Sequence, residues 1–166
     1  MTEIKTTPLF LHDGAFADED CVIHCAQQIL QRRFERMSEP LRSYQQVSDF
    51  LKVTFQAFDR QVFSCLFLDG SHRVIALEHL FYGSLTNLKV ATREVIRAAL
   101  KHNCAGIVTV RSFPLGMDSV DDDDLAAALS LQRMCETFEL SLVDHFLVCT
   151  DGIVSYVDLG YLMRQY

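Results

Sequence analysis

The spacing of apolar and polar residues in the first third of the chain predicts two helices. Apolar residues recur at helical spacing from Asp18 to Met37, with Asp18 as a plausible first cap, and the segment ends at a proline. The same spacing returns from Ser43 to Phe55, where Ser43 is expected to open the second helix.

The rest of the chain alternates between strand and helix patterns. Apolar runs at 61–69 and 73–83 flank the Asp69-Gly70 turn, which is a strong β-hairpin signal. A helix at 92–103 follows, with Thr92 expected as its cap. The remaining predicted elements are a strand at 105–110, a helix after Asp121, strands at 140–150 and 153–159, and a short terminal helix around 161–163.

This order of elements predicts an α/β fold, with a mixed β-sheet flanked by helices. We expect an N-terminal arm and helix at 1–40 and a main domain at 41–166, which together form one compact unit. The 166 residues are enough to bury a real core, and no linker divides them.

Composition excludes several broad classes of protein. The apolar fraction is 49%, yet no apolar run approaches the roughly 18 residues that a membrane helix needs. The N-terminus does not resemble an export signal, so a cytoplasmic location is expected. The net charge of −7 argues against a general nucleic-acid surface.

The stretch from Cys104 to Asp124 is the first candidate for a functional site. It begins as a buried-strand pattern, breaks at a Pro/Gly turn (113–116) and enters the acidic run 121–124, which opens a helix. Such an arrangement brings side chains together at the carboxyl end of a strand. The acidic run alone is more typical of a solvated helix start than of a Mg²⁺ or Ca²⁺ site.

Four sequence blocks resemble blocks of one known family. They are LFLDGSHRVIALEHLFYGSL, TREVIRAALKHNCAGIV, LVDHFLV and DGIVSYVDLGYL. On these blocks the chain resembles the RadC family, whose core is a JAMM (MPN) metalloprotease-like domain, from about Asp20 to Tyr161. The resemblance implies a JAMM/MPN fold, which is cytidine-deaminase-like.

The family's metal motif is an upstream Glu, then H-x-H-P-x-G, then S-x-x-D. In that family two His and the Asp bind zinc, the Glu acts as base, and the Ser helps to hold the oxyanion. Carried over by the resemblance, the Glu falls on Glu78, the two His on Arg111 and Phe113, the P-x-G on Pro114 and Gly116, the Ser on Asp121 and the Asp on Asp124.

Only part of the implied zinc site is present in this sequence. Glu78 and Asp124 match, but Arg111 and Phe113 replace both histidines and Asp121 replaces the serine. Arginine does not lose its proton to ligate zinc, and phenylalanine has no lone pair. We therefore expect no metal cofactor and treat Glu78 as a vestigial base.

Two structural roles are expected for the replacements. Arg111 is predicted to stand in for the zinc charge and to form a salt bridge with both Glu78 and Asp124. The alternative is that Arg111 anchors a substrate. Phe113 is predicted to fill the volume of the second histidine, which would leave a dry, apolar cavity. Asp144 and His145 are expected to form an internal hydrogen-bonding pair.

The resemblance and the missing ligands together suggest a pseudo-enzyme that acts as a protein-interaction or scaffold module. The expected partner is a protein segment along a sheet edge, or a second copy of the chain, with no strong nucleic-acid signature and no membrane. One alternative is a zinc-dependent metallopeptidase or isopeptidase of the JAMM class. Another is an accessory factor associated with DNA repair, which the family name suggests.

Overall fold

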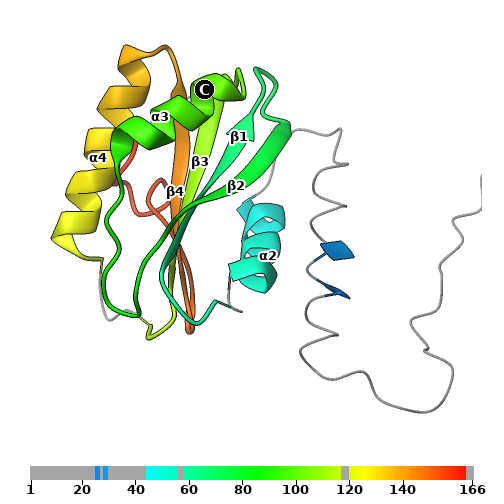
Figure 1. Ribbon diagram of the computed structural model, residues 1–166, viewed down its shortest axis with the longest axis vertical. Helices are drawn as coiled ribbons and strands as arrows, with labels where there is room; N and C mark the ends of the chain where they lie inside the picture. The colour runs from blue at the N-terminus through cyan, green and yellow to red at the C-terminus, as the bar shows by residue number, and fades with distance from the viewer. Residues whose placement is uncertain (1–24, 27, 30–43, 56–57, 117–119, 164–166) are drawn as a thin grey trace, which may run out of the picture.

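The computed structural model describes residues 25–26, 28–29, 44–55, 58–116 and 120–163 (Figure 1). Most of the predicted arm and first helix at 1–40 lies outside these residues, so that division of the chain stays a prediction. Three helices are described at length, α2 (Tyr44–Phe55), α3 (Thr92–Lys101) and α4 (Asp122–Thr137). The strands are β1 (Val62–Leu68), β2 (Val74–Tyr82), β3 (Gly106–Phe113), β4 (Ser141–Cys149) and β5 (Gly152–Ser155).

The five strands form one mixed sheet in the order β2-β1-β3-β4-β5. Strands β3 and β4 are parallel, because α4 carries the chain back between them. The other three pairs are antiparallel. The predicted α/β class with a mixed sheet and flanking helices is thus confirmed.

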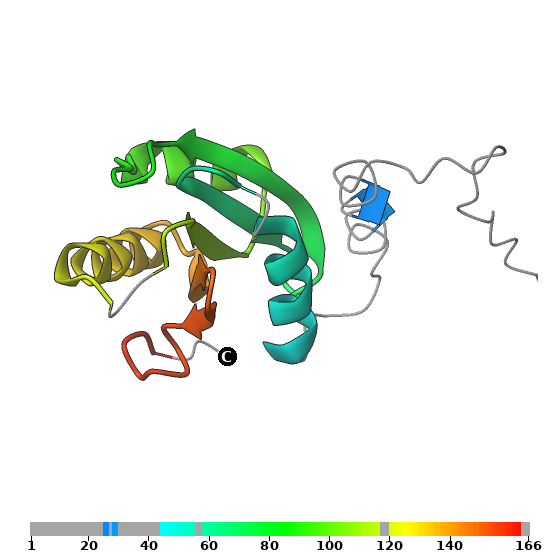
Figure 2. The same ribbon diagram turned by 90° about the horizontal axis from the view of Figure 1, so that it is seen from below.

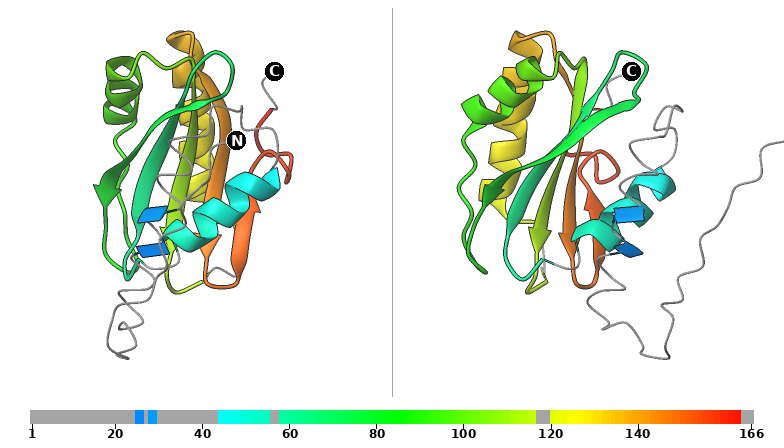
Figure 3. Two further views of the ribbon diagram at one scale, coloured as in Figure 1. Left: turned by 90° about the vertical axis from the view of Figure 1, so that its right-hand side faces the viewer. Right: turned by 45° about the vertical axis from the view of Figure 1, so that its right-hand side comes forward.

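Helices cover both faces of the sheet (Figure 2). On one face α3 and α4 pack over a core that includes Phe67, Ile107 and Leu147, each fully buried. On the other face α2 packs through Leu51 and other apolar residues against a second core. Figure 3 shows α2 lying across the face opposite to α3 and α4. Every residue of β1 is buried, because this strand is covered on both faces.

The turns that sequence indicated have a clear physical basis. At the predicted hairpin, the Asp69 carboxylate accepts hydrogen bonds from the backbone N–H of Ser71 (2.8 Å) and Arg73 (2.9 Å). After β3, Gly116 has φ of 76° and its N–H donates to the Phe113 carbonyl at 3.1 Å. Glycine adopts this left-handed backbone conformation without strain, so the turn at Gly116 ends β3 beside the start of α4.

Three details of the predicted elements are wrong. The cap of α3 is Ala91, with no side-chain cap bond, and Thr92 is the first helical residue. Strand β5 ends at Ser155, whose hydroxyl accepts the N–H of Asp158 at 3.0 Å and turns the chain. Residues 161–163 are not helical, since Gly160 adopts φ of 76° and breaks the turn.

Among the residues that the structure describes, no helix is both long and apolar enough to cross a membrane.

The core over β1 gives a test of the fold. Phe67 is fully buried and stacks on His102 with 4.4 Å between ring centroids. We expect Phe67→Ala to lower the free energy of unfolding by about 3–5 kcal/mol, because it leaves a cavity under α3. Chemical denaturation monitored by circular dichroism measures this loss. The matched control is Phe138→Ala, at a phenylalanine that is 45% exposed, and equal losses in the two variants would contradict the packing described.

Candidate functional site

The candidate site lies where β3 ends beside the start of α4. A cleft of about 320 Å³ opens there, between the loop after β2 and the first turns of α4. Its floor contains Arg111 from β3, Asp124 from α4 and His145 from β4. The stretch from Cys104 to Asp124 therefore does border a cleft. The floor of that cleft is built by side chains from three elements, β3, α4 and β4.

Helix geometry explains how Asp124 reaches the floor of the cleft. Asp121 caps α4, and its carboxylate accepts the N–H of Asp123 at 3.2 Å. Side chains of a helix change direction by about 100° per residue, so that within one turn Asp121, Asp122 and Asp123 are exposed while Asp124 is buried. A carboxylate in the first turn is favoured by the positive end of the helix dipole.

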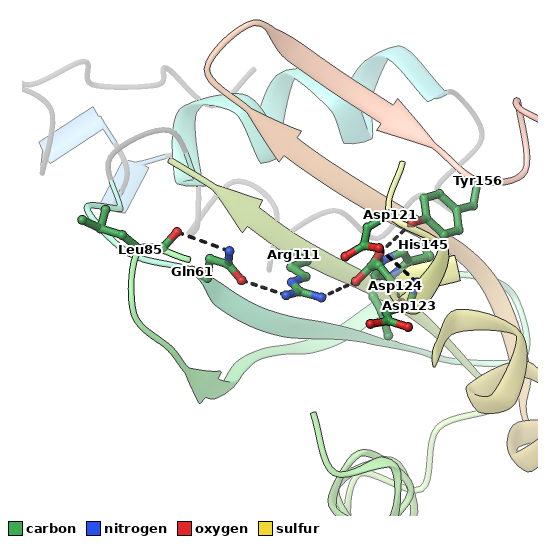
Figure 4. A network of polar contacts seen from close by, with 9 residues as sticks. Gln61, Leu85, Arg111, Asp121, Asp123, Asp124, His145 and Tyr156 are labelled. Atoms are coloured by element: carbon green, nitrogen blue, oxygen red, sulfur yellow. Dashed lines mark hydrogen bonds and ion pairs between the residues drawn. The ribbon is translucent and has the colours of Figure 1, made fainter. Parts of the chain in front are cut away.

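Three side chains donate hydrogen bonds to the buried Asp124 carboxylate (Figure 4). Arg111 donates from Nη1 to Oδ1 as an ion pair. The hydroxyl of Tyr156 donates to Oδ2 at 2.6 Å, and Nε2 of His145 lies 3.2 Å from the same oxygen. Both oxygens of the carboxylate are thus engaged by protein donors.

These donors determine the charge state of Asp124. Burial acts to raise the pKa of Asp124, but hydrogen bonding and charge from His145, the Tyr156 hydroxyl and the Arg111 guanidinium outweigh it, and the pKa falls well below its usual range. Burial and the bond to Asp124 raise the pKa of Tyr156. At neutral pH the tyrosine is therefore a hydroxyl donor and Asp124 an acceptor.

Arg111 connects the two sides of the cleft. Its Nη2 donates to Oε1 of Gln61 at 2.8 Å, and Nε2 of Gln61 donates to the Leu85 carbonyl at 3.3 Å (Figure 4). The guanidinium carbon lies 4.8 Å from the centre of the Phe113 ring. Arg111 is mostly buried, with 15% of its side chain exposed, so its position is set by these partners.

Glu78 does not belong to this network, which corrects the expected three-residue salt bridge. Its Oε1 lies 2.7 Å from Nε2 of His102 and 3.5 Å from Nζ of Lys101, both at the end of α3. The bond to His102 is the main reason that the pKa of Glu78 is lowered. Of the two carboxylates expected around it, Arg111 pairs only with Asp124, since Glu78 pairs with residues at the end of α3.

Phe113 does not turn the cleft into an apolar cavity. It lines a separate pocket of about 320 Å³ with Phe55, Phe58 and Pro114, while the cleft floor is charged. On the side of the cleft, the Phe113 ring packs against the guanidinium of Arg111.

Asp144 and His145 share one hydrogen bond, in which Oδ1 of the Asp144 side chain accepts the backbone N–H of His145 at 2.7 Å. The Asp144 side chain is directed to Ser155 at 2.6 Å, and the His145 ring to Thr109 at 2.8 Å. Thr109, His145 and Asp124 form a chain of side chains in the order of a nucleophilic triad. Thr109 is fully buried, so no substrate reaches its hydroxyl and the chain is structural.

The side chains present do not fit a tetrahedral zinc ion. In the described ranges, no group of three or more His, Cys, Asp or Glu residues is placed to hold a metal. The position of the first family histidine carries a guanidinium already bonded to Asp124, and the position of the second carries a phenyl ring. Three protein ligands and an open position are what zinc hydrolysis needs.

Sequence reasoning missed Gln61, His145 and Tyr156 as members of this network. The last two had a signal, because each is a polar residue inside an apolar strand pattern, LVDHFLV and IVSYVD, and buried polar groups need partners. Gln61 had none, since a glutamine before a strand is ordinary.

Comparisons with known proteins agree with the fold. The model of the RadC-like JAB domain matches residues 41–161. A UPF0758 protein of Ectopseudomonas mendocina is 33% identical over 93% of this chain and 68% of its own length. One from Cupriavidus taiwanensis is 34% identical over 86% of the chain and 62% of its own length. One from Ralstonia nicotianae is 32% identical over 83% and 63%. The chain therefore spans about two thirds of the length of these relatives.

The buried ion pair gives a prediction for stability. Arg111→Met and Asp124→Asn are each expected to cost about 3 kcal/mol of unfolding free energy, because each leaves a buried charge without its partner. The double variant should lose clearly less than the sum of the two, which a double-mutant cycle measures by denaturation. Arg60→Met, which breaks an exposed pair with Asp59, is the control and should leave the midpoint unchanged. Additive losses would show that the two side chains do not interact.

A second prediction concerns pH. The pKa of Asp124 is lower in the folded protein than in the unfolded chain, so its contribution is fully present above the unfolded value of about 4 and is lost as pH falls below it. The stability difference between the wild type and Asp124→Asn should therefore be constant near neutral pH and shrink in acid. Urea titrations at a series of pH values measure it. A difference that persists unchanged into strong acid would contradict the low pKa.

Proposed function

The chain belongs to the RadC-like JAB domain family, and from this premise we propose that it has lost zinc-dependent hydrolysis and acts as a protein-interaction module. The observation that carries the proposal is the ion pair between Arg111 and Asp124. In the family motif these two positions belong to a zinc-binding histidine and a zinc-binding aspartate.

The ion pair explains why the fold can do without a metal. A buried carboxylate is costly unless a positive charge or several donors face it. Arg111 supplies that charge permanently, since a guanidinium stays protonated and offers a fixed fork of donors. Asp124 is then compensated by the protein alone, and its oxygens have no need of a metal ion.

The other motif positions support the same conclusion. Glu78, where the family has its base, is paired with His102 and does not border the cleft. Asp121, where the family has a serine, caps α4 through its carboxylate. A base, two ligands and an oxyanion donor would all have to come from other residues.

Three features of the fold support an interaction role. The sheet and its helices are intact, a cleft remains open, and several apolar side chains are exposed, including Leu115 (68%) and Met163 (81%). Self-association through such residues is the alternative to a different protein partner. The proposal includes a cytoplasmic location, and all five cysteines in the described ranges are free thiols, which suits a reducing compartment.

Metal content tests the proposal directly. We expect the purified full chain to contain far less than one zinc per molecule by mass spectrometry of the metal, and Asp124→Ala to leave that value unchanged. Arg111→His combined with Phe113→His restores two ligands and should raise the zinc content, because the aspartate position is still filled. About one zinc per wild-type chain, lost in Asp124→Ala, would overturn the proposal in favour of an active hydrolase.

A further inference from the structure

We propose that the open edge of β2 is the docking site of this module, and that its occupant is an extended peptide with an apolar anchor flanked by acidic residues. The inference rests on the proposed interaction role and names the surface and the partner. Strand β2 lies at one edge of the sheet and pairs only with β1 (Figure 3). In the part of the chain that the structure describes, no strand covers its other side.

The regular part of this edge is short. Bulges in the pairing with β1 leave Ile75 and Leu80 outside the register, so the continuous ladder runs from Ala76 to His79. Ladder bonds over so few residues give little affinity by themselves, so a docked segment needs a side-chain pocket as well. Such bulges also limit indiscriminate edge pairing and favour a partner whose side chains fit.

A pocket of the required kind lies beside the edge. A cavity of about 360 Å³ is formed between β2 and α3. Leu80, Phe81 and Ala98 form its apolar wall, and the rest of its lining is charged (Glu78, Glu94, Arg97 and Lys101). Side chains of an added strand alternate between the two faces of the sheet, so every second one would be directed to the α3 side. One large apolar side chain of the peptide would pack against this apolar wall.

The charges on α3 select the flanks of the peptide. Arg93, Arg97 and Lys101 recur every four residues and are 87%, 78% and 72% exposed, so they form one basic stripe along the helix. Glu94 pairs with both Arg93 and Arg97, and Glu78 pairs with Lys101, so three cations face two carboxylates. The stripe therefore keeps a surplus of one positive charge on a chain of net charge −7. A peptide with glutamate or aspartate beside its anchor complements this stripe, and a basic peptide does not.

The test is a selection followed by binding measurements. A phage-displayed library of random peptides is panned on the immobilised full chain, and the enriched peptides are synthesised with a fluorescent label for polarisation assays. We expect acidic residues around one aromatic or branched apolar residue, and affinity that falls with salt. Arg97→Glu should weaken binding about three- to tenfold, because it reverses a rim charge. Arg133→Glu, an equal charge reversal at an exposed site on α4, should leave it unchanged.

Backbone pairing has its own signature. Two versions of the selected peptide carry N-methyl groups on alternate amides, one set on each side of the strand. Only the version methylated on the β2 side should lose binding, because the other side donates nothing to the sheet. Loss with both versions or with neither, no enrichment, or equal effects of the two arginine reversals would overturn the β2 site. Peptides whose binding is weakened by Arg133→Glu alone would also overturn the β2 site, but they would support the proposed interaction role. Zinc-dependent hydrolysis by the chain would overturn the interaction role and would not change the result with the N-methylated peptides.

Discussion

A carboxylate held away from water needs compensation, and the arrangement around Asp124 follows from that constraint. Its carboxylate is brought inside by the first turn of α4 and meets donors from three strands or strand ends. The guanidinium of Arg111 supplies a full positive charge, and Tyr156 and His145 supply the rest. The contact of α4 with β3 and β4 therefore includes charged and polar side chains as well as apolar ones.

The same constraint distinguishes what the fold needs, which is charge compensation of Asp124, from what catalysis needs, which is activation of water. In a zinc hydrolase of this fold, a metal would compensate the aspartate and would at the same time activate water. A guanidinium performs only the first of these two tasks. Under the proposed function, Arg111 at the position of one family histidine keeps the charge compensation of Asp124 and supplies no group that activates water.

Much of the architecture was predictable, because the spacing of apolar and polar residues, the Asp69-Gly70 turn and the Pro/Gly break at 113–116 are local signals in the sequence. The pairing of Arg111 with Asp124 could be anticipated from charge and motif position. The position of Glu78 could not, since the competing partner His102 arrives from the end of a helix that is distant in sequence. The end of β5 at Ser155 was missed because the Ser155 hydroxyl accepts the N–H of Asp158 and donates to the buried Asp144, and this turns the chain inside an apolar run.

The link from Arg111 through Gln61 to the Leu85 carbonyl has a consequence for motion. One terminal nitrogen of the guanidinium donates to Asp124 in the first turn of α4. The other donates to Gln61, whose side chain donates to the Leu85 carbonyl in the loop across the cleft. A displacement of either wall therefore has to lengthen or break a hydrogen bond of Arg111 or of Gln61. The width of the cleft is thus set by one chain of hydrogen bonds that runs from α4 to the loop after β2.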